Sequence, residues 1–505
     1  MHTRFLVFVF CAVQSACLGE RRPFTNRMAN SGTTYLARAA RQPVRWQPWG
    51  RDAFALAAKL DRPVLLYVGS DACRWCAETD RAIYTDPEIG TLINALFVPV
   101  RVDRDERPDV AQRYQAAVER LAGLHGWPLT VFLTADGSPF FGGTYFPADD
   151  PITGRGLKQL LPEVAKSYRD QRSFIVQQAA RLQQMVLTGN GESRGALRLS
   201  LVQQGIVAVT RELDDAVRNH GAVGSVMHVE ATTLLLSGDT AARASAVRAL
   251  DLMLDTTIGS VGEDPPRLVR AALAGSLAKA WAVTGAPRYR EAGRALIRSL
   301  ATELPPEESI FVDQEAYVIE HVMVAAAILG EPAVENRART ALDILLRRTY
   351  AHGWGVRHAT VAPATGGTTP QGMLQDQVQM ASACLAAHHL SHESRYLDVA
   401  LDLAAIVERG FADPLGGYYD VAPPVTDALP SSALGDRTKH VFDDVLPGAN
   451  AATALLLAHL AQVTGDPSYR RRAQATLVAF AGAVNGAGVR ASTFLAAARE
   501  ILGTP

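Results

Sequence analysis

The sequence has few cysteines, almost no net charge and no apolar run long enough to cross a membrane. Its 505 residues include five cysteines, too few for a disulfide scaffold, so cysteine chemistry must be local. The 50 Lys and Arg residues balance 51 Asp and Glu residues, and no basic stripe forms, which argues against nucleic acid or anionic membrane as a partner. A hydrophobic content of 48% excludes a disordered or fibrous chain and, at this length, indicates roughly two to four globular domains.

The first residues have the composition of a secretory leader. Residues 1–19 contain a basic start, an apolar run from Phe5 to Val13 and then small residues. That run is too short to span about 30 Å of hydrocarbon, so no integral membrane span is expected. We predict that residues 1–19 are a signal peptide and that the protein is exported, periplasmic or secreted. Two alternatives stay open: a lipid anchor at Cys17, and a true start at Met28 that would leave the protein cytoplasmic.

The composition of the chain changes near residue 190. Residues 26–187 mix aromatic, β-branched and Pro/Gly-rich stretches, whereas residues 194–505 are rich in Ala and Leu at helical spacing. Between them, residues 188–193 are small and polar and have no periodic apolar face. We therefore predict an α/β domain over 26–187, a linker over 188–193 and an all-α domain over 194–505.

The first domain reads as strands and helices in alternation. Short apolar runs predict buried strands at residues 62–68 and 97–102, and a hairpin with its turn at Asp136 and Gly137. Helices are expected to begin at Ser70 or Asp71, either of which could cap the first, then at Pro87, Pro108 and Leu157. The order β-α-β-α-β-β, followed by a last helix, is the thioredoxin arrangement.

Cys73 and Cys76 lie in the first turns of one of these predicted helices, with Arg74 and Trp75 between them. Residues three apart on a helix share a face, and the amides at a helix N-terminus favour a thiolate there, as does the charge of Arg74. We predict that Cys73 attacks and Cys76 resolves, so that the redox-active Cys73–Cys76 disulfide is the only cofactor. An inert remnant stays open, and so does a metal half-site, although no second Cys/His pair occurs at ligand spacing.

Several other residues are candidates for the same site. Pro128 opens a strand, and in this fold such a proline faces the dithiol in the cis form, so that Trp127, Pro128 and Trp75 would contact a client. His125 could assist proton transfer, and Asp103 should lie at the same carboxyl edge of the sheet as the cysteines. The alternatives are an ordinary strand-start proline, a solvated loop histidine and a structural salt-bridged loop.

Residues 26–147 resemble the thioredoxin-like domain of the spermatogenesis-associated thioredoxin-like protein family, whose bacterial homologues are catalogued as a domain of unknown function. The matching stretches are residues 26–27, 35–36, 43–44, 46, 48–50, 73–76, 102–109, 126–129 and 140–147. The chain departs from the family at Arg74 and Ala77, where the family usually has His, and a segment with His and Asp is replaced by Ala39, Arg41 and Arg45. The resemblance implies that this chain keeps the dithiol in altered acid–base surroundings.

The second domain contains an internal repeat. Turns of related sequence at residues 284–289, 391–396 and 464–469, with weaker copies at 237–239 and 329–331, each follow one Ala/Leu-rich helix and precede another. About six such hairpins are implied, and each needs neighbours to bury its apolar face, which predicts an (α/α)6 toroid. The family resemblance points to the same toroid, of the six-hairpin glycosidase-like kind. Cys384 is expected in the core, and His388, His389 and His392 on the surface.

Three functions are compatible with these features. The favoured one is an exported thiol–disulfide oxidoreductase whose clients are protein thiols or disulfides, with the toroid binding a client or ligand. The second is a toroid that binds or modifies a small carbohydrate beside a vestigial dithiol, which would need paired carboxyl groups. The third is a scaffold without catalysis. The candidate groups in the toroid are Asp313, Glu315, Asp376, His440, Asp443, Asp444 and Asn450.

Overall fold

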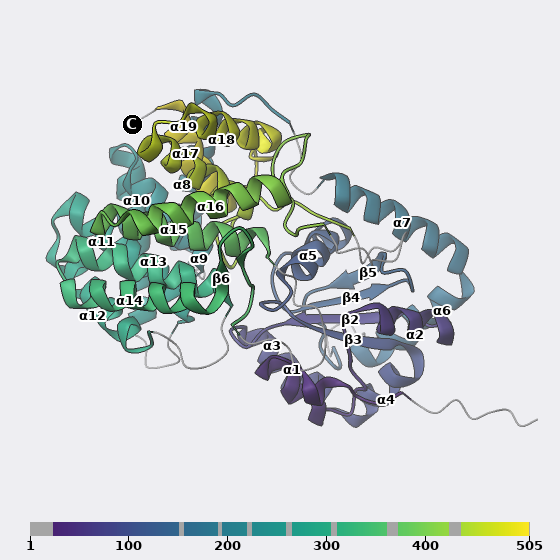
Figure 1. Cartoon of the computed structure of the whole chain (residues 1–505). Coiled ribbons are helices and arrows are strands. Elements are labelled where there is room, and N and C mark those ends of the chain that lie inside the picture. Colours follow the sequence, from purple (N-terminus) through teal and green to yellow (C-terminus); the bar gives the residue numbers. More distant parts are fainter. Residues whose placement is uncertain are drawn as a thin grey trace, which may run out of the picture.

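The computed structural model of the chain shows an α/β domain followed by a ring of helices, and the predicted fold class is confirmed (Figure 1). The structure describes residues 24–150, 156–189, 194–219, 225–258, 265–304, 311–360, 372–423 and 436–503. The predicted signal peptide lies outside the described residues, as does the predicted linker from residue 190 onward. Helix α7 (Arg172–Gly189) extends into the first two residues of that linker.

The first domain is built on a five-stranded sheet in the order β1-β3-β2-β4-β5. The three strands β1, β3 and β2 are parallel, whereas β4 and β5 add antiparallel strands on the other side of β2. All residues of β2, β3 and β4 are buried, as expected for strands covered on both faces. The strands are β1 (Gln47–Pro48), β2 (Val64–Gly69), β3 (Val98–Asp103), β4 (Leu129–Leu133) and β5 (Pro139–Gly143).

Helices cover both faces of this sheet. Val64, Leu66 and Val68 pack against one set of helices, and the alternating residues Leu65 and Tyr67 pack against the other set. The first set is α2 (Arg51–Leu60), α5 (Pro108–Ala122) and α7; the second is α1 (Thr34–Arg38), α4 (Pro87–Leu96) and α6 (Leu157–Asp170). The alternation of β2 therefore divides the domain into two cores.

The predicted N-cap of the helix that carries the dithiol is wrong. Helix α3 (Arg74–Thr79) begins after Cys73, which occupies the N-cap position itself, so neither Ser70 nor Asp71 caps the helix. The other starts follow the sequence signals: the Asp86 carboxylate accepts hydrogen bonds from the backbone N–H groups of Glu88 and Ile89, and α5 begins at Pro108. The first sulfur is therefore placed directly against the free amides of α3.

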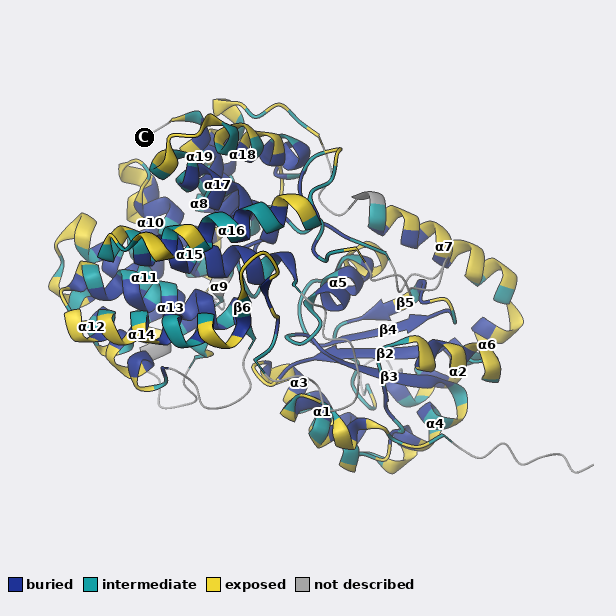
Figure 2. Ribbon diagram, viewed as in Figure 1, coloured by how far each residue is buried: buried dark blue, intermediate teal, exposed yellow. Residues whose placement is uncertain are grey.

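The second domain is a closed ring of six helical hairpins. Each inner helix packs against the next, and the last inner helix returns to the first. Figure 2 shows mostly buried residues on the inner helices and exposed ones along the outer helices. The inner helices are α9 (Val226–Leu236), α11 (Arg267–Thr284), α13 (Val312–Leu329), α15 (Leu374–Ser391), α17 (Ala449–Thr464) and α19 (Ser492–Leu502). The outer helices are α8 (Leu199–Arg218), α10 (Thr240–Met253), α12 (Pro287–Thr302), α14 (Pro332–Thr349), α16 (Ser394–Phe411) and α18 (Pro467–Phe480).

The repeated turns join an inner helix to the following outer helix, as the sequence predicts. Gly285 and Gly465 end α11 and α17 with φ values of 67° and 72°, in the left-handed region that favours glycine. The repeated tyrosine then ties neighbouring outer helices together: the Tyr289 hydroxyl donates to Asp251 at 2.7 Å. The Tyr396 hydroxyl does the same to Asp343 at 3.0 Å. Among the described helices, none combines the length and the apolar character needed to cross a membrane.

Candidate active site

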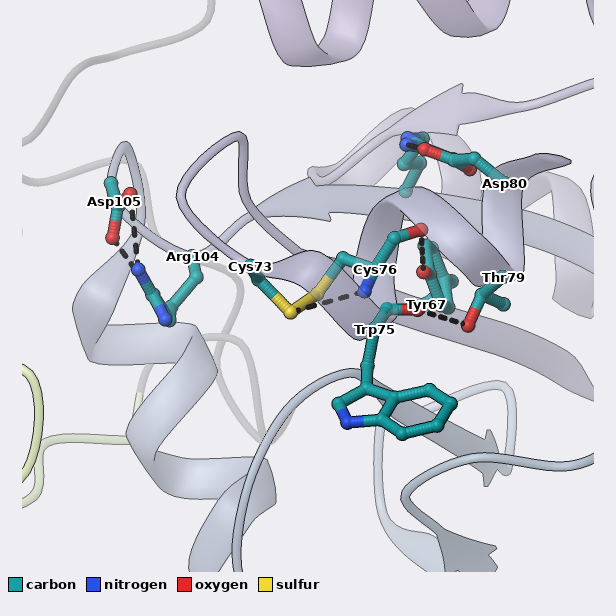
Figure 3. The surroundings of a disulfide bond; sticks show 9 residues. Tyr67, Cys73, Trp75, Cys76, Thr79, Asp80, Arg104 and Asp105 are labelled. Atoms are coloured by element: carbon teal, nitrogen blue, oxygen red, sulfur yellow. Dashed lines mark hydrogen bonds and ion pairs between the residues drawn. A yellow bond between two sulfur atoms is a disulfide. The ribbon is translucent and has the colours of Figure 1, made fainter. Parts of the chain in front are cut away.

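The structure joins Cys73 and Cys76 in a disulfide at the N-terminus of α3 (Figure 3). Their Cα atoms lie 5.2 Å apart, and Cys73 Sγ accepts a hydrogen bond from the backbone N–H of Cys76 at 3.1 Å. An amide that donates to this sulfur stabilises a negative charge on it after reduction. Cys73 keeps 9% of its surface exposed, whereas Cys76 is fully buried. Cys73 is therefore the less deeply buried of the two cysteines, and their roles as attacking and resolving sulfur stay a prediction.

The predicted client-contact residues come from two different elements. Trp75 is 59% exposed, its ring centroid lies 5.7 Å from that of Tyr145, and Figure 3 shows its indole projecting away from the disulfide. The Trp127–Pro128 peptide bond is cis and leads directly into β4, whose Leu129 pairs with Val68 near the end of β2. An exposed indole and a strand-start backbone segment are thus available at this end of the sheet.

Asp103 and Arg74, two of the predicted supporting residues, differ in their burial. Asp103 ends β3 and pairs with Gly69, the last residue of β2, so it lies at the dithiol edge as predicted. Burial, reinforced by the charge of Asp105, raises the pKa of Asp103 to about 7. Arg74 is exposed. The Asp103 carboxyl thus has a raised proton affinity at the dithiol edge of the sheet.

His125 lies at the boundary between the two domains. Its ring nitrogens form ion pairs with Asp444 at 3.7 Å and with Glu119 at 3.8 Å. Burial lowers the pKa of His125, but these two carboxylates outweigh that effect and raise it to about 8. The geometry therefore ties His125 to the toroid through Asp444.

The toroid approaches the sheet through the N-terminal ends of its inner helices. A cleft between the domains is lined by Arg104 and Trp127 on one side and by Gln314, Gln375 and Leu446 on the other. The Arg104 guanidinium lies 5.6 Å from the centre of the Trp127 ring, and the backbone N–H of Arg104 donates to the carbonyl oxygen of Gly69 at 2.7 Å. The loop that follows β3, which begins with Arg104, therefore connects the dithiol edge of the sheet to the interdomain cleft.

A buried histidine fastens the two domains together. His358 is fully buried; its Nδ1 lies 2.9 Å from Asp376 Oδ1 and its Nε2 lies 2.8 Å from the carbonyl oxygen of Asp105. Both partners are acceptors, so we assign a proton to each ring nitrogen. Asp313, His358 and Asp376 are close enough together to surround a cation, but a doubly protonated imidazole has no lone pair for a metal.

The pairing of His358 predicts a pH-dependent contribution to stability. Burial lowers the pKa of His358, but the charge and hydrogen bond of Asp376 raise it to about 10. A raised folded-state pKa stabilises the protein fully below the unfolded pKa of about 6.5, and this contribution is lost as the pH rises through 10. We expect His358→Gln to lower the free energy of unfolding by about 3 kcal/mol at pH 6 and by much less above pH 10.

Urea unfolding of both proteins at the two pH values measures this difference. His352→Gln is the matched control, because the His352 side chain is 86% exposed, and it should show no such pH dependence. An equal loss of stability in His358→Gln at both pH values would contradict the assigned charge.

The candidate groups that the sequence offers in the toroid are engaged in structural contacts. Asp376 accepts the backbone N–H groups of Asp313 and Met373, and Glu315 pairs with Arg267. Asp443 accepts the N–H groups of Gly448 and Thr493, both at 2.9 Å. The rest are also engaged: Asp313 with Gln314, Asp444 with His125, His440 with Asp420, and Asn450 with Tyr418 and His440. These groups stabilise the ends of the inner helices.

A cavity of about 380 Å³ lies instead along the axis of the toroid. All six inner helices line it, and its polar groups include Glu230, Lys279, Glu320 and His459. Burial and the charge of Glu230 raise the pKa of Glu320 to about 8. Sequence reasoning missed these residues. Each of these four residues lies on a different inner helix and faces the cavity, so only the closed ring brings them together.

The first domain matches a known protein family model. Residues 25–187 match the family model Thioredox_DsbH, described as "Protein of unknown function, DUF255", which confirms the resemblance predicted for this part of the chain. Spermatogenesis-associated protein 20 of Rattus norvegicus is 37% identical over 174 residues, 34% of this chain and 22% of that protein. The uncharacterized protein B0495.5 of Caenorhabditis elegans is 35% identical over 159 residues, 32% of this chain and 22% of that protein. The matches thus span about a fifth of the length of these relatives.

Several solved structures also align with part of this chain at low identity. Unsaturated glucuronyl hydrolase from Bacillus sp. GL1 is 16% identical with a TM-score of 0.42, over 56% of this chain and 84% of that chain. A D-mannose isomerase is 12% identical with a TM-score of 0.42, over 56% of this chain and 86% of that chain.

Proposed function

We propose that the protein is a thiol–disulfide oxidoreductase that uses Cys73 and Cys76. The observation that carries this proposal is the position of Cys73 Sγ at the N-cap of α3, where it accepts the backbone N–H of Cys76 and is bonded to the fully buried sulfur of Cys76. The free amides of a helix N-terminus stabilise a thiolate, which an inert buried pair would not need. The disulfide is the proposed cofactor, and the predicted leader would place it in an oxidising compartment.

The proposed exchange proceeds in two displacement steps. In the reduced protein the Cys73 thiolate attacks a client disulfide, forms a mixed disulfide and releases one client sulfur as a thiolate, which takes up a proton. Cys76 then loses its proton to the carboxylate of Asp103, attacks Cys73 Sγ and releases the second client thiolate. The client disulfide gains two electrons, and the protein dithiol becomes the Cys73–Cys76 disulfide. The reverse sequence oxidises a client dithiol.

The cleft between the domains is the proposed place for the client chain. Trp127 lines the cleft and precedes the cis Pro128, so an extended client segment could run from the cleft past the dithiol edge. Asp105, Asp444 and Gln375 would offer polar contacts from both domains. This arrangement gives the toroid a role in holding protein thiols or disulfides near Cys73.

An insulin-reduction assay with purified full-length protein tests the proposal. With dithiothreitol as electron donor, we expect the wild-type chain to accelerate insulin precipitation well above the rate with dithiothreitol alone. A wild-type rate equal to that background would contradict oxidoreductase activity and would leave the toroid as the functional part.

A small carbohydrate ligand in the toroid is the second candidate function, and the axial cavity favours it. Lys279 and Glu320 line this cavity, are half-buried, and form no hydrogen bond or ion pair with any described residue. Polar groups that lose part of their solvation without gaining a partner are costly, so a ligand with several hydroxyl groups would complement them. Because water occupies about 30 Å³ per molecule, the cavity has room for roughly a dozen non-hydrogen atoms, the size of a monosaccharide.

Lys279→Met is expected to weaken binding of a monosaccharide about tenfold, because one charged hydrogen-bond donor is lost. Isothermal titration with D-glucose and D-mannose measures the effect, with a wild-type Kd on the order of 1 mM expected. Lys166→Met is the matched control, since the Lys166 side chain is 71% exposed on α6. Equal affinity in wild type and Lys279→Met, or no binding of either sugar, would reject the cavity as a sugar site.

A further inference from the structure

The hydroxyl of Tyr35 is a buried polar group without a hydrogen-bond partner among the described residues. Tyr35 lies on α1 and is 2% exposed. The Arg101 guanidinium lies 4.2 Å from the centre of the Tyr35 ring, and Asp80 holds that guanidinium through two hydrogen bonds of 2.6 and 2.7 Å. The ring is therefore fixed in position; its hydroxyl lies near the Tyr67 side chain but in hydrogen-bond geometry with none of the described residues. A buried donor left unsatisfied costs stability and calls for an explanation.

Gly69 shows where this hydroxyl points. A Cβ atom built on Gly69 would lie 2.2 Å from Tyr35 Oη and 3.1 Å from Cys76 Sγ. The hydroxyl and the sulfur thus converge on the same space above one Cα atom, and residue 69 contributes no atom between them. A larger residue could not occupy this position without displacing the tyrosine.

Asp103 lies on the same face of the sheet, on the neighbouring strand. Gly69 pairs with Asp103 in parallel register, and Tyr67 pairs with Arg101 two residues earlier. Side chains alternate along a strand, so Asp103 lies on the face of the sheet that carries Tyr67 and Arg101, where Tyr35 also packs. Burial raises the pKa of Tyr35 well above its usual value, so the phenol keeps its proton.

We propose that the Tyr35 hydroxyl donates a hydrogen bond to the sulfur of Cys76 when the disulfide is reduced. This inference rests on the proposed redox role of the dithiol and adds a residue to it. In the disulfide, Cys76 Sγ is a weak acceptor and the hydroxyl stays unpaired. After reduction the sulfur of Cys76 is a better acceptor, and it becomes a strong one when Cys76 loses its proton; the bond to Tyr35 then stabilises the thiolate.

The consequence falls on the resolving step. Cys76 passes its proton to Asp103 and becomes the thiolate that attacks Cys73, so a donor beside Cys76 increases the fraction of reactive thiolate. The same bond stabilises the reduced state relative to the disulfide and makes the reduction potential of the pair less negative. Tyr35 contributes nothing to the first attack by Cys73, because it faces the second sulfur.

Tyr35→Phe in the full-length chain is the test. Equilibration with dithiothreitol or glutathione redox buffers at pH 8 should show a potential more negative by about 30 mV, which is a tenfold change in the equilibrium constant. Release of a client from the mixed disulfide should slow about tenfold, whereas alkylation of Cys73 should keep the wild-type rate. In the Cys73→Ser background, thiolate absorbance should show a higher pKa for Cys76.

Tyr84→Phe is the matched control. Tyr84 is a buried tyrosine whose ring centroid lies 4.6 Å from that of Tyr67 in the same aromatic cluster, and its loss should leave the potential unchanged. Unchanged potential and release rate in Tyr35→Phe, or an equal shift in Tyr84→Phe, would overturn the proposal. The redox-buffer titration needs no client, so it judges the role of Tyr35 even if the insulin assay finds the wild type inactive.

Discussion

Cys73→Ser is expected to reduce the insulin-reduction rate by at least about a hundredfold, to the background of dithiothreitol alone, because the attacking sulfur is removed. Serine keeps an oxygen that can accept the N–H of Cys76 at the N-cap of α3, so the fold around the site should be retained. Circular dichroism and thermal melting of the variant check that the loss is chemical rather than structural.

Cys76→Ser provides the complementary result. Cys73 can still attack, but no second sulfur releases the client, so a mixed disulfide should accumulate that mass spectrometry detects after alkylation. Cys384→Ser is the matched control, because Cys384 is buried in α15 within the toroid core and should leave activity intact. Retained activity in Cys73→Ser, or no trapped client in Cys76→Ser, would remove the dithiol mechanism.

Asp80→Asn is expected to lower the free energy of unfolding by about 3 kcal/mol, the second large effect. Arg101 is 1% exposed, and Asp80 is the only carboxylate among the described residues that forms an ion pair with it. The substitution keeps the size of the side chain but leaves a buried guanidinium without a counter-charge among Tyr35, Trp46 and Tyr67. Urea unfolding monitored by tryptophan fluorescence measures the loss.

Glu78→Gln, two residues earlier in the chain, tests whether any lost ion pair has the same effect. Glu78 pairs with Arg81, whose side chain is 78% exposed, and solvent screens such a pair. The variant should unfold at the wild-type urea concentration. If both variants lose stability equally, the burial of Arg101 is not the reason.

The elements of the first domain could be predicted where sequence signals are local. Continuous apolar runs predicted β2 and β3, and the Asp86-Pro87 and Pro108 starts predicted α4 and α5, because capping and proline geometry act within one helical turn. The cap of α3 was predicted wrongly. A cysteine sulfur replaced the usual oxygen acceptor there, and residue preferences favour Ser or Asp.

The residues that line the toroid cavity could not be predicted from local sequence signals. Its repeated turns predicted the hairpins, but the acidic residues picked out as a carbohydrate site serve as caps and ion pairs at the helix ends. Glu230, Lys279 and Glu320 gave no motif, since each lies on a different inner helix. Their proximity depends on the closure of the ring.

The sequence by itself determined the two domain types and the position of the dithiol in the first turn of a helix. These features depend on neighbours within a few residues. Only the tertiary structure decided that the Tyr35 hydroxyl and Cys76 Sγ lie together above Gly69, that Asp103 pairs with Gly69, and that His358 binds the toroid to the loop after β3. Strand register and helix packing bring together residues that are far apart in the chain. No local pattern of residues encodes such distances.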